Sequence, residues 1–281
     1  MLLDHIKNHK ILQRRKKIND LEIISSNMRH IQLFGTTVII ILFFANCSGY
    51  EKLNKALANP EKVTKLKIKY GRIGSLPKEI EQLTNLKTLY LFKNKLTTIP
   101  EEIGNLKNLE TLVISSNNLV ELPASICQLT KLKKLSLKHN YIKQLPNEMG
   151  NLVNLEELYL EYNGLISLPY SIGNLSNLEM LNISNNNLFK IPNEIGKLYN
   201  LRFFVIGKNN LVDLPDEIGN LSSLRELNVA FCGPMVKIPE TIRYCKNLEF
   251  LYIDKTSILP YSINNVNSRL QVVIKEKGEL N

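Results

Sequence analysis

The segment from Leu109 to Leu129 reads LETLVISSNNLVELPASICQL. Apolar residues occupy positions 1, 4, 6, 11, 14, 18 and 21 of this unit, and a proline follows at position 15. Position 1 recurs every 23 residues, with 24 before the last member: Val63, Leu86, Leu109, Leu132, Leu155, Leu178, Leu201, Leu224 and Leu248. Prolines recur every 23 residues as far as Pro215 and then after 24 and 21 residues: Pro77, Pro100, Pro123, Pro146, Pro169, Pro192, Pro215, Pro239 and Pro260. The chain therefore contains about nine tandem units.

Each unit predicts one short strand and one return segment. Apolar positions 4 and 6 alternate with polar positions 3, 5 and 7, which is the period of a β-strand. A strand that recurs once per unit stacks in parallel on its neighbours. The proline at position 15 has no N–H for a central ladder, so the strand ends before it. Pro-x-x-Ile-Gly then favours a tight turn or a short helix.

The segment LxxLxLxxNxL resembles the leucine-rich-repeat signature. The LPxxIGNLxxL that follows resembles the 23-residue subtype of Ras-group-related and many bacterial leucine-rich-repeat proteins. The resemblance covers about three quarters of the chain. It implies an α/β fold: a curved horseshoe solenoid with a parallel sheet on the concave face and short helical or turn segments on the convex face.

Position 9 carries an asparagine in most units, and we interpret it as structural. A buried amide there bonds backbone groups of the bend that lack other partners. The six members are Asn94, Asn117, Asn140, Asn163, Asn186 and Asn209. Gly71, Cys232 and Thr256 take the place in the first, eighth and ninth units.

The chain divides into four expected parts. Residues 1–47 form a leader, and 48–62 form an N-terminal helical cap whose Leu53, Ala56 and Leu57 share one face. Residues 63–269 hold the repeats, and 270–281 form a last strand and a polar tail.

The leader predicts export and lipidation. Residues 28–47 read MRHIQLFGTTVIIILFFANC, a basic start followed by an apolar core too short to span a bilayer. This resembles a signal peptide at about 28–46 with a relaxed bacterial lipoprotein box, in which Cys47 takes the lipid. Phe44 and Asn46 depart from the stricter form. An uncleaved hydrophobic segment with an incidental cysteine is the alternative, and the true start is either Met1 or Met28.

Residue chemistry argues against catalysis and nucleic-acid binding. His139 is the only histidine after residue 47, and it has no nucleophile at a recognisable spacing. No metal or cofactor motif is present, and the residues after Leu270 leave no room for a catalytic domain. The net charge of +10 is mixed with acids along the repeats. Cys127 is expected to be partly exposed, Cys245 to be buried, and Glu156, Glu157 and Glu161 to form a solvated acidic surface.

The binding surface is expected on the concave face, where side chains at positions 3, 5, 7 and 8 point away from the core. Exposed aromatic residues are typical anchors for a protein partner. The candidates are Tyr90, Phe92, Tyr159, Tyr162, Phe203, Phe231, Phe250 and Tyr252. Lys65, Lys67, Lys69 and Lys93 form a basic end.

The sequence thus predicts a non-enzymatic, monomeric scaffold that binds another protein and is attached to a bacterial cell envelope through lipid on Cys47. The alternative is a cytoplasmic scaffold in signal transduction, as the Ras-group resemblance implies.

Overall fold

The computed structural model describes residues 48–276 of the 281-residue chain. The chain divides into two units, Met1–Ala45 and Asn46–Asn281. The leader, the proposed lipidation residue Cys47 and residues 277–281 lie outside the described residues. The division into leader, cap, repeats and tail stays a prediction.

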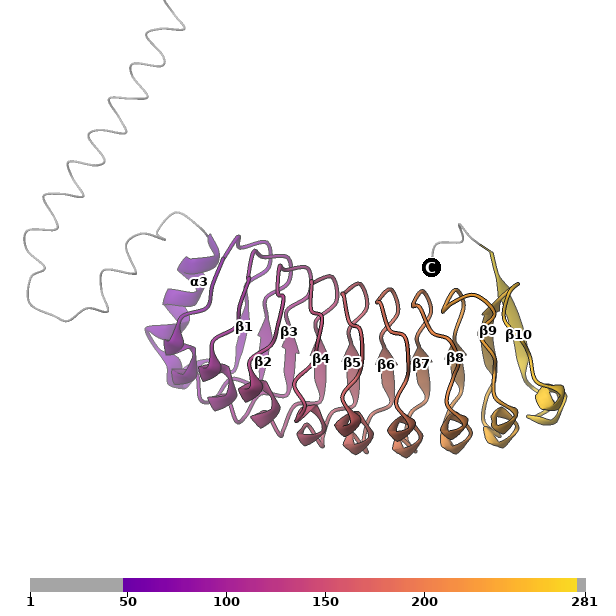
Figure 1. The fold of residues 1–281 in the computed structure, drawn as a ribbon. Coiled ribbons are helices and arrows are strands. Elements are labelled where there is room, and N and C mark those ends of the chain that lie inside the picture. Colours follow the sequence, from indigo (N-terminus) through magenta and orange to yellow (C-terminus); the bar gives the residue numbers. More distant parts are fainter. Residues whose placement is uncertain (1–47, 277–281) are drawn as a thin grey trace, which may run out of the picture. The chain divides into compact units, whose positions relative to one another are not determined.

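Ten short parallel strands form one open sheet in the order of the sequence, β1 to β10 (Figure 1). The strands are β1 Lys65–Lys67, β2 Thr88–Tyr90, β3 Thr111–Val113, β4 Lys134–Ser136, β5 Glu157–Tyr159, β6 Met180–Asn182, β7 Phe203–Val205, β8 Glu226–Asn228, β9 Phe250–Asp254 and β10 Gln271–Lys275. The predicted leucine-rich-repeat solenoid is confirmed, with one strand per unit.

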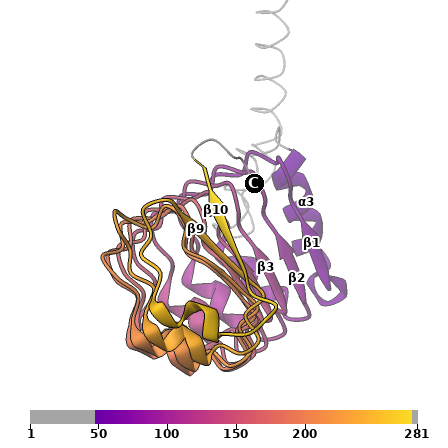
Figure 2. The same cartoon turned by 90° about the vertical axis from the view of Figure 1, so that its right-hand side faces the viewer.

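A row of 3-10 helices forms the return side, as the Pro-x-x-Ile-Gly pattern predicts, and Figure 2 views the stacked coils from the C-terminal end. These helices are η2 Lys78–Gln82, η3 Glu101–Asn105, η4 Ala124–Gln128, η5 Met149–Asn151, η6 Tyr170–Asn174, η7 Asn193–Lys197, η8 Asp216–Asn220, η9 Glu240–Tyr244 and η10 Tyr261–Asn265. Helix α3, Ser48–Leu57, and the 3-10 turn η1, Pro60–Lys62, precede β1.

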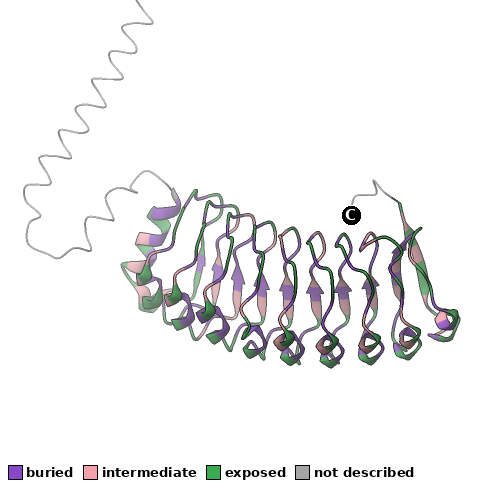
Figure 3. Ribbon diagram, in the orientation of Figure 1, coloured by how far each residue is buried: buried purple, intermediate pink, exposed green. Residues whose placement is uncertain are grey.

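The apolar positions of the unit form a continuous core between the strands and the 3-10 helices (Figure 3). Leu89, Leu112 and Leu135 pair in register across β2, β3 and β4, and all three are fully buried. Because the unit length is constant, each leucine stacks on the same position of the next unit, and no single unit has a core of its own.

The asparagines of position 9 form a ladder parallel to the sheet. In Asn140 the side-chain Nδ2 donates to the carbonyl oxygens of Leu137, at 2.7 Å, and Ile114, at 3.0 Å. Its Oδ1 accepts from the N–H of Leu119 at 3.1 Å. Each amide therefore joins two neighbouring units, and the other five asparagines repeat these bonds one unit apart.

The ladder changes its chemistry near the C-terminal end. The Cys232 thiol donates to the Ile206 carbonyl oxygen at 3.1 Å, in place of an amide. Beside the ladder, Asp254 at position 7 of the ninth unit accepts from the N–H of Phe231 at 2.5 Å and from the N–H of Thr256 at 2.7 Å. Burial would raise the pKa of Asp254, but hydrogen bonds from Thr256 and from backbone N–H groups outweigh it and lower the pKa.

Glycine at position 19 lets successive 3-10 helices approach closely. A Cβ on Gly173, Gly196 or Gly219 would lie 2.5 Å from a carbonyl oxygen of the next helix. The third unit has Cys127 at this position, and the next 3-10 helix, η5, is shortened to three residues. Cys127 is buried, so the expectation that it would be partly exposed is wrong. Five other units carry glycine at this position.

Replacing Gly196 by alanine should lower the free energy of unfolding by about 1–3 kcal/mol, because the new methyl group meets the Glu217 carbonyl oxygen and Cβ within 2.6 Å. Urea denaturation followed by circular dichroism measures this. Gly74→Ala is the matched control, since its Cβ would meet nothing within 4 Å. Equal effects at both positions would contradict the close-packing explanation.

Candidate functional site

The strand face comprises the side chains at positions 3, 5, 7 and 8 of each unit, which point away from the core. The turn after each strand begins at position 8, where the backbone takes a left-handed conformation, with φ of 54–61° in eight consecutive units: Tyr70, Lys93, Ser116, His139, Tyr162, Asn185, Lys208 and Phe231. A bulky residue in this conformation is uncommon and needs support from the surrounding structure. Here the repeated turn supplies that support and holds position 8 at the edge of the strand face.

The eight aromatic candidates all reach this face, although most of them are half-buried. Tyr162 is exposed, and the other seven are of intermediate exposure: Tyr90, Phe92, Tyr159, Phe203, Phe231, Phe250 and Tyr252. The structure brings Phe250 and Tyr252 into a stacked pair with ring centroids 6.2 Å apart. The set as a whole is spread along the sheet, so it forms separate anchor points and not one cluster.

A hydrogen-bonded network lies at the centre of the strand face. The Lys134 ammonium contacts Glu157 Oε2 at 2.5 Å, and the Tyr159 hydroxyl donates to the same oxygen at 2.9 Å. Burial and the Glu157 carboxylate raise the pKa of Tyr159 to about 12. Burial opposes ionisation of Glu157, but the bonds from Lys134 and Tyr159 outweigh it and lower the pKa of Glu157. The Tyr159 ring is therefore held in place before any partner arrives.

Glu161, beside this network, is buried, so the expectation of a solvated acidic surface is wrong for this residue. Its Oε1 pairs with the Lys138 ammonium at 3.4 Å, and its Oε2 has no hydrogen-bond partner within the described residues. Lys138 also lies 5.8 Å from the centre of the Tyr159 ring. Glu156 is exposed, as expected, and pairs with Lys133.

Lysines lie over a tyrosine ring at both ends of the strand face. At the N-terminal end, Lys67 and Lys69 lie 5.2 and 5.6 Å from the centre of the Tyr90 ring. At the C-terminal end, Lys275 lies 5.0 Å from the Tyr252 ring, and burial raises the pKa of Glu226 although Lys275 opposes the shift. Burial also raises the pKa of Tyr252.

The histidine and the three cysteines of the described residues are stacked on a ring or buried. His139 stacks on Tyr162, with ring centroids 4.3 Å apart. Burial raises the pKa of the Cys127 thiol to about 11 and that of Cys245 to about 12, and it also raises that of Cys232. A raised pKa disfavours the reactive thiolate. Residues 48–276 hold no group of three potential metal ligands.

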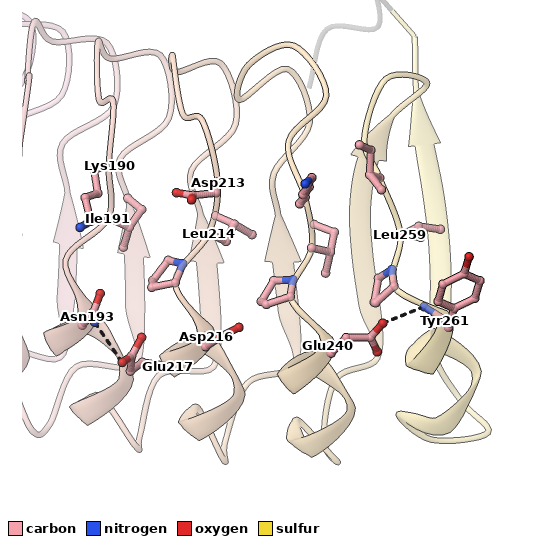
Figure 4. Close-up of a pocket in the computed structure, with 16 residues that line it drawn as sticks. Lys190, Ile191, Asn193, Asp213, Leu214, Asp216, Glu217, Glu240, Leu259 and Tyr261 are labelled. Atoms are coloured by element: carbon pink, nitrogen blue, oxygen red, sulfur yellow. Dashed lines mark hydrogen bonds between the residues drawn. The ribbon is translucent and has the colours of Figure 1, made fainter.

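An open groove of about 640 Å³ follows the flank of the solenoid between the strands and the 3-10 helices (Figure 4). Leu214, Leu259 and three prolines form part of its wall. Its charges are mixed and partly paired: Asn193 Nδ2 donates to Glu217 Oε1 at 3.0 Å, and the Tyr261 N–H donates to Glu240 Oε1 at 3.2 Å. The groove therefore shows no convergent set of polar groups.

Sequence reasoning missed an apolar row beside this groove. Ile166, Phe189, Val212 and Met235 are exposed in four consecutive units. The sequence contains this row, because all four residues occupy position 12 of their units, and Ile166, Phe189 and Val212 come directly after the buried leucine of position 11. Position 12 is not one of the apolar positions that define the repeat, so an apolar residue there indicates an exposed apolar side chain. Figure 4 shows the neighbouring wall residues, including Ile191 and Leu214.

The model of the leucine-rich repeat region matches residues 77–163 and 158–232. Together these matches span more than half of the 281 residues. The chain belongs to the leucine-rich-repeat family. A comparison of this leucine-rich-repeat protein with curated proteins gave no match.

Solved structures give the same fold. A leucine-rich-repeat protein of Leptospira interrogans is 28% identical, covers 80% of this chain and 76% of its own, and has a TM-score of 0.56. The ectodomain of the plant membrane receptor kinase GASSHO1/SCHENGEN3 from Arabidopsis thaliana is 30% identical over 74% of this chain, with a TM-score of 0.67. The present chain spans 26% of that ectodomain. Internalin C2 from Listeria monocytogenes, 23% identical over 70% of this chain and 83% of its own, has a TM-score of 0.63 and shows the fold alone.

Within residues 48–276, every helix is too short or too polar to cross a bilayer.

Proposed function

We propose that this leucine-rich-repeat protein is a non-enzymatic scaffold that binds another protein through its strand face. The observation that carries the proposal is the set of rings held on an otherwise rigid sheet, with Tyr159 fixed by Glu157 and Lys134 at its centre. A preformed surface loses little conformational freedom on binding, and so its contacts are converted efficiently into affinity.

The solved relatives support this choice. The structure of the Arabidopsis receptor ectodomain is a complex with CASPARIAN STRIP INTEGRITY FACTOR 2, and another plant neighbour, RGFR1, is in complex with RGF2. The second is 26% identical to this chain, with a TM-score of 0.51. Because these chains are longer than ours, their activities do not transfer directly, but the shared sheet offers the same kind of surface.

Replacing Tyr159 and Phe203 together by alanine should weaken capture of the partner by roughly thirtyfold, since truncation of each half-buried aromatic anchor costs about 1 kcal/mol. The double variant Tyr170→Ala, Tyr199→Ala removes two exposed rings from the return side and is the control. Quantitative mass spectrometry of proteins retained by the tagged chain measures capture. Equal losses in both variants would contradict a role for the strand face.

We further propose that Cys47 carries the lipid of a bacterial envelope lipoprotein. Metabolic labelling with a radioactive fatty acid should label the wild-type chain and should fail for Cys47→Ala. Cys127→Gly is the control for loss of a thiol, because five other units carry glycine at this position. An unlabelled wild-type chain, or label that survives Cys47→Ala, would reject the anchor and favour a cytoplasmic scaffold.

A further inference from the structure

A basic hollow of about 620 Å³ lies between helix α3 and the edge strand β1. Every ionisable residue that lines it is a lysine: Lys52, Lys55, Lys62, Lys65 and Lys67. The other lining residues are Asn59 and the apolar Ala56, Val63 and Leu66. The hollow therefore combines an apolar floor with a uniformly positive rim.

The lysines of this rim have no ionic partner within residues 48–276, whereas lysines of later units do. Lys87, Lys133 and Lys138 each lie within 3.5 Å of a carboxylate oxygen one unit away. Lys65 and Lys67 face each other instead, and this repulsion, with a smaller effect of burial, lowers the pKa of Lys67. Nearby positive charges that the chain itself leaves unneutralised favour an anionic ligand.

Strand β1 also offers backbone groups on the side away from β2. The N–H groups of Ile68 and Tyr70 donate to the Tyr90 and Phe92 carbonyl oxygens of the neighbouring unit. Successive N–H groups of a strand point to opposite edges, so those of Lys65 and Lys67 point away from β2. The sheet ends at β1 on this side. An exposed edge of this kind accepts an added strand.

We infer that the basic hollow binds an extended acidic segment of the partner protein, which adds to the edge of β1 and places its carboxylates against the lysine rim. This rests on the proposed protein-binding function and specifies the chemistry of the partner. An added strand would lie about 4.8 Å from β1, on the side where the sheet ends. A flat membrane surface or a nucleic-acid duplex presents its phosphates on a much broader body and does not use the backbone edge.

Fluorescence anisotropy of the full chain with a fluorescein-labelled octapeptide of alternating glutamate and threonine tests this inference. The triple variant Lys52→Gln, Lys62→Gln, Lys67→Gln should weaken binding by about tenfold, from three partly screened ion pairs. The control variant Lys95→Gln, Lys143→Gln, Lys190→Gln removes the same charge from exposed positions outside the hollow and should leave affinity within about twofold. A peptide with alternate backbone nitrogens methylated should bind at least tenfold more weakly.

If the two triple variants lost peptide affinity equally, the effect would come from net charge alone and the inference would be overturned. It would also be overturned if the methylated and unmethylated peptides bound equally well. Preferential binding of phosphatidylglycerol vesicles or of a DNA duplex, without peptide binding, would also overturn it. The Tyr159→Ala, Phe203→Ala variant should bind the peptide normally. Two results together would reject the acidic segment and leave the scaffold function standing. The first is that the Tyr159→Ala, Phe203→Ala variant loses its partner, and the second is that the wild-type chain does not bind the octapeptide.

Discussion

Replacing Phe204 by alanine is expected to lower the free energy of unfolding by about 3–5 kcal/mol. Phe204 lies at position 4 of its unit, where other units have leucine, and its side chain is fully buried between β6 and β8. Removal of the ring leaves a cavity that the neighbouring coils cannot close, because each is held in register by the ladder on both sides. Urea denaturation followed by circular dichroism measures the loss.

Phe203 is the control for this experiment, because it precedes Phe204 on the same strand and its ring points to the strand face. Its side chain is half-buried, so Phe203→Ala should cost about 1 kcal/mol or less. Equal destabilisation by the two variants, or a larger loss at Phe203, would mean that the assignment of the two faces of the sheet is wrong.

Replacing Asn140 by alanine should lower the free energy of unfolding by about 2–4 kcal/mol, although the removed side chain is small. The Leu119 N–H loses its partner, and a buried polar group without one costs about 1–3 kcal/mol. The Leu137 and Ile114 carbonyl oxygens each lose one of two amide donors and keep the other, from Asn163 and Asn117. The loss includes bonds to the preceding unit, so the interface between the third and fourth units weakens most. Native-state hydrogen exchange should therefore show the greatest loss of protection at β3 and β4.

Asn118 is the matched control for the ladder, because it is an exposed asparagine at position 10 of the third unit. Asn118→Ala should change the free energy of unfolding by less than about 0.5 kcal/mol. If Asn140→Ala lowered the free energy of unfolding as little as Asn118→Ala, the asparagine ladder would not stabilise the stacked units.

The fold could be predicted from the repeat because the buried leucines and asparagines occupy the same positions in successive units. Leu89, Leu112 and Leu135 are buried in register because the unit length is constant. The asparagine ladder was predicted for the same reason: a buried amide at a fixed place in a bend has few possible roles. These predictions need only contacts within a unit or between one unit and the next.

Features that depend on contacts between different positions were harder to predict. Cys127 looked partly exposed, because position 19 lies in the 3-10 helices of the return side. Glu161 looked solvated, because its burial comes from the side chains around it on the strand face. The basic hollow joins α3 to β1, and its apolar floor and open edge follow from how that helix packs and not from any repeat. Lys65 and Lys67 were noted, but Lys52 and Lys62 were not.

Site-specific photo-crosslinking tests the central claim, that the strand face and not the return side binds the partner. A benzophenone amino acid would replace Tyr159 or Phe203 on the strand face, and Tyr170 or Tyr199 on the return side, in cells that produce the protein. We predict one discrete crosslinked adduct from the first two positions and none from the second two. Adducts from Tyr170 or Tyr199 alone would contradict the claim.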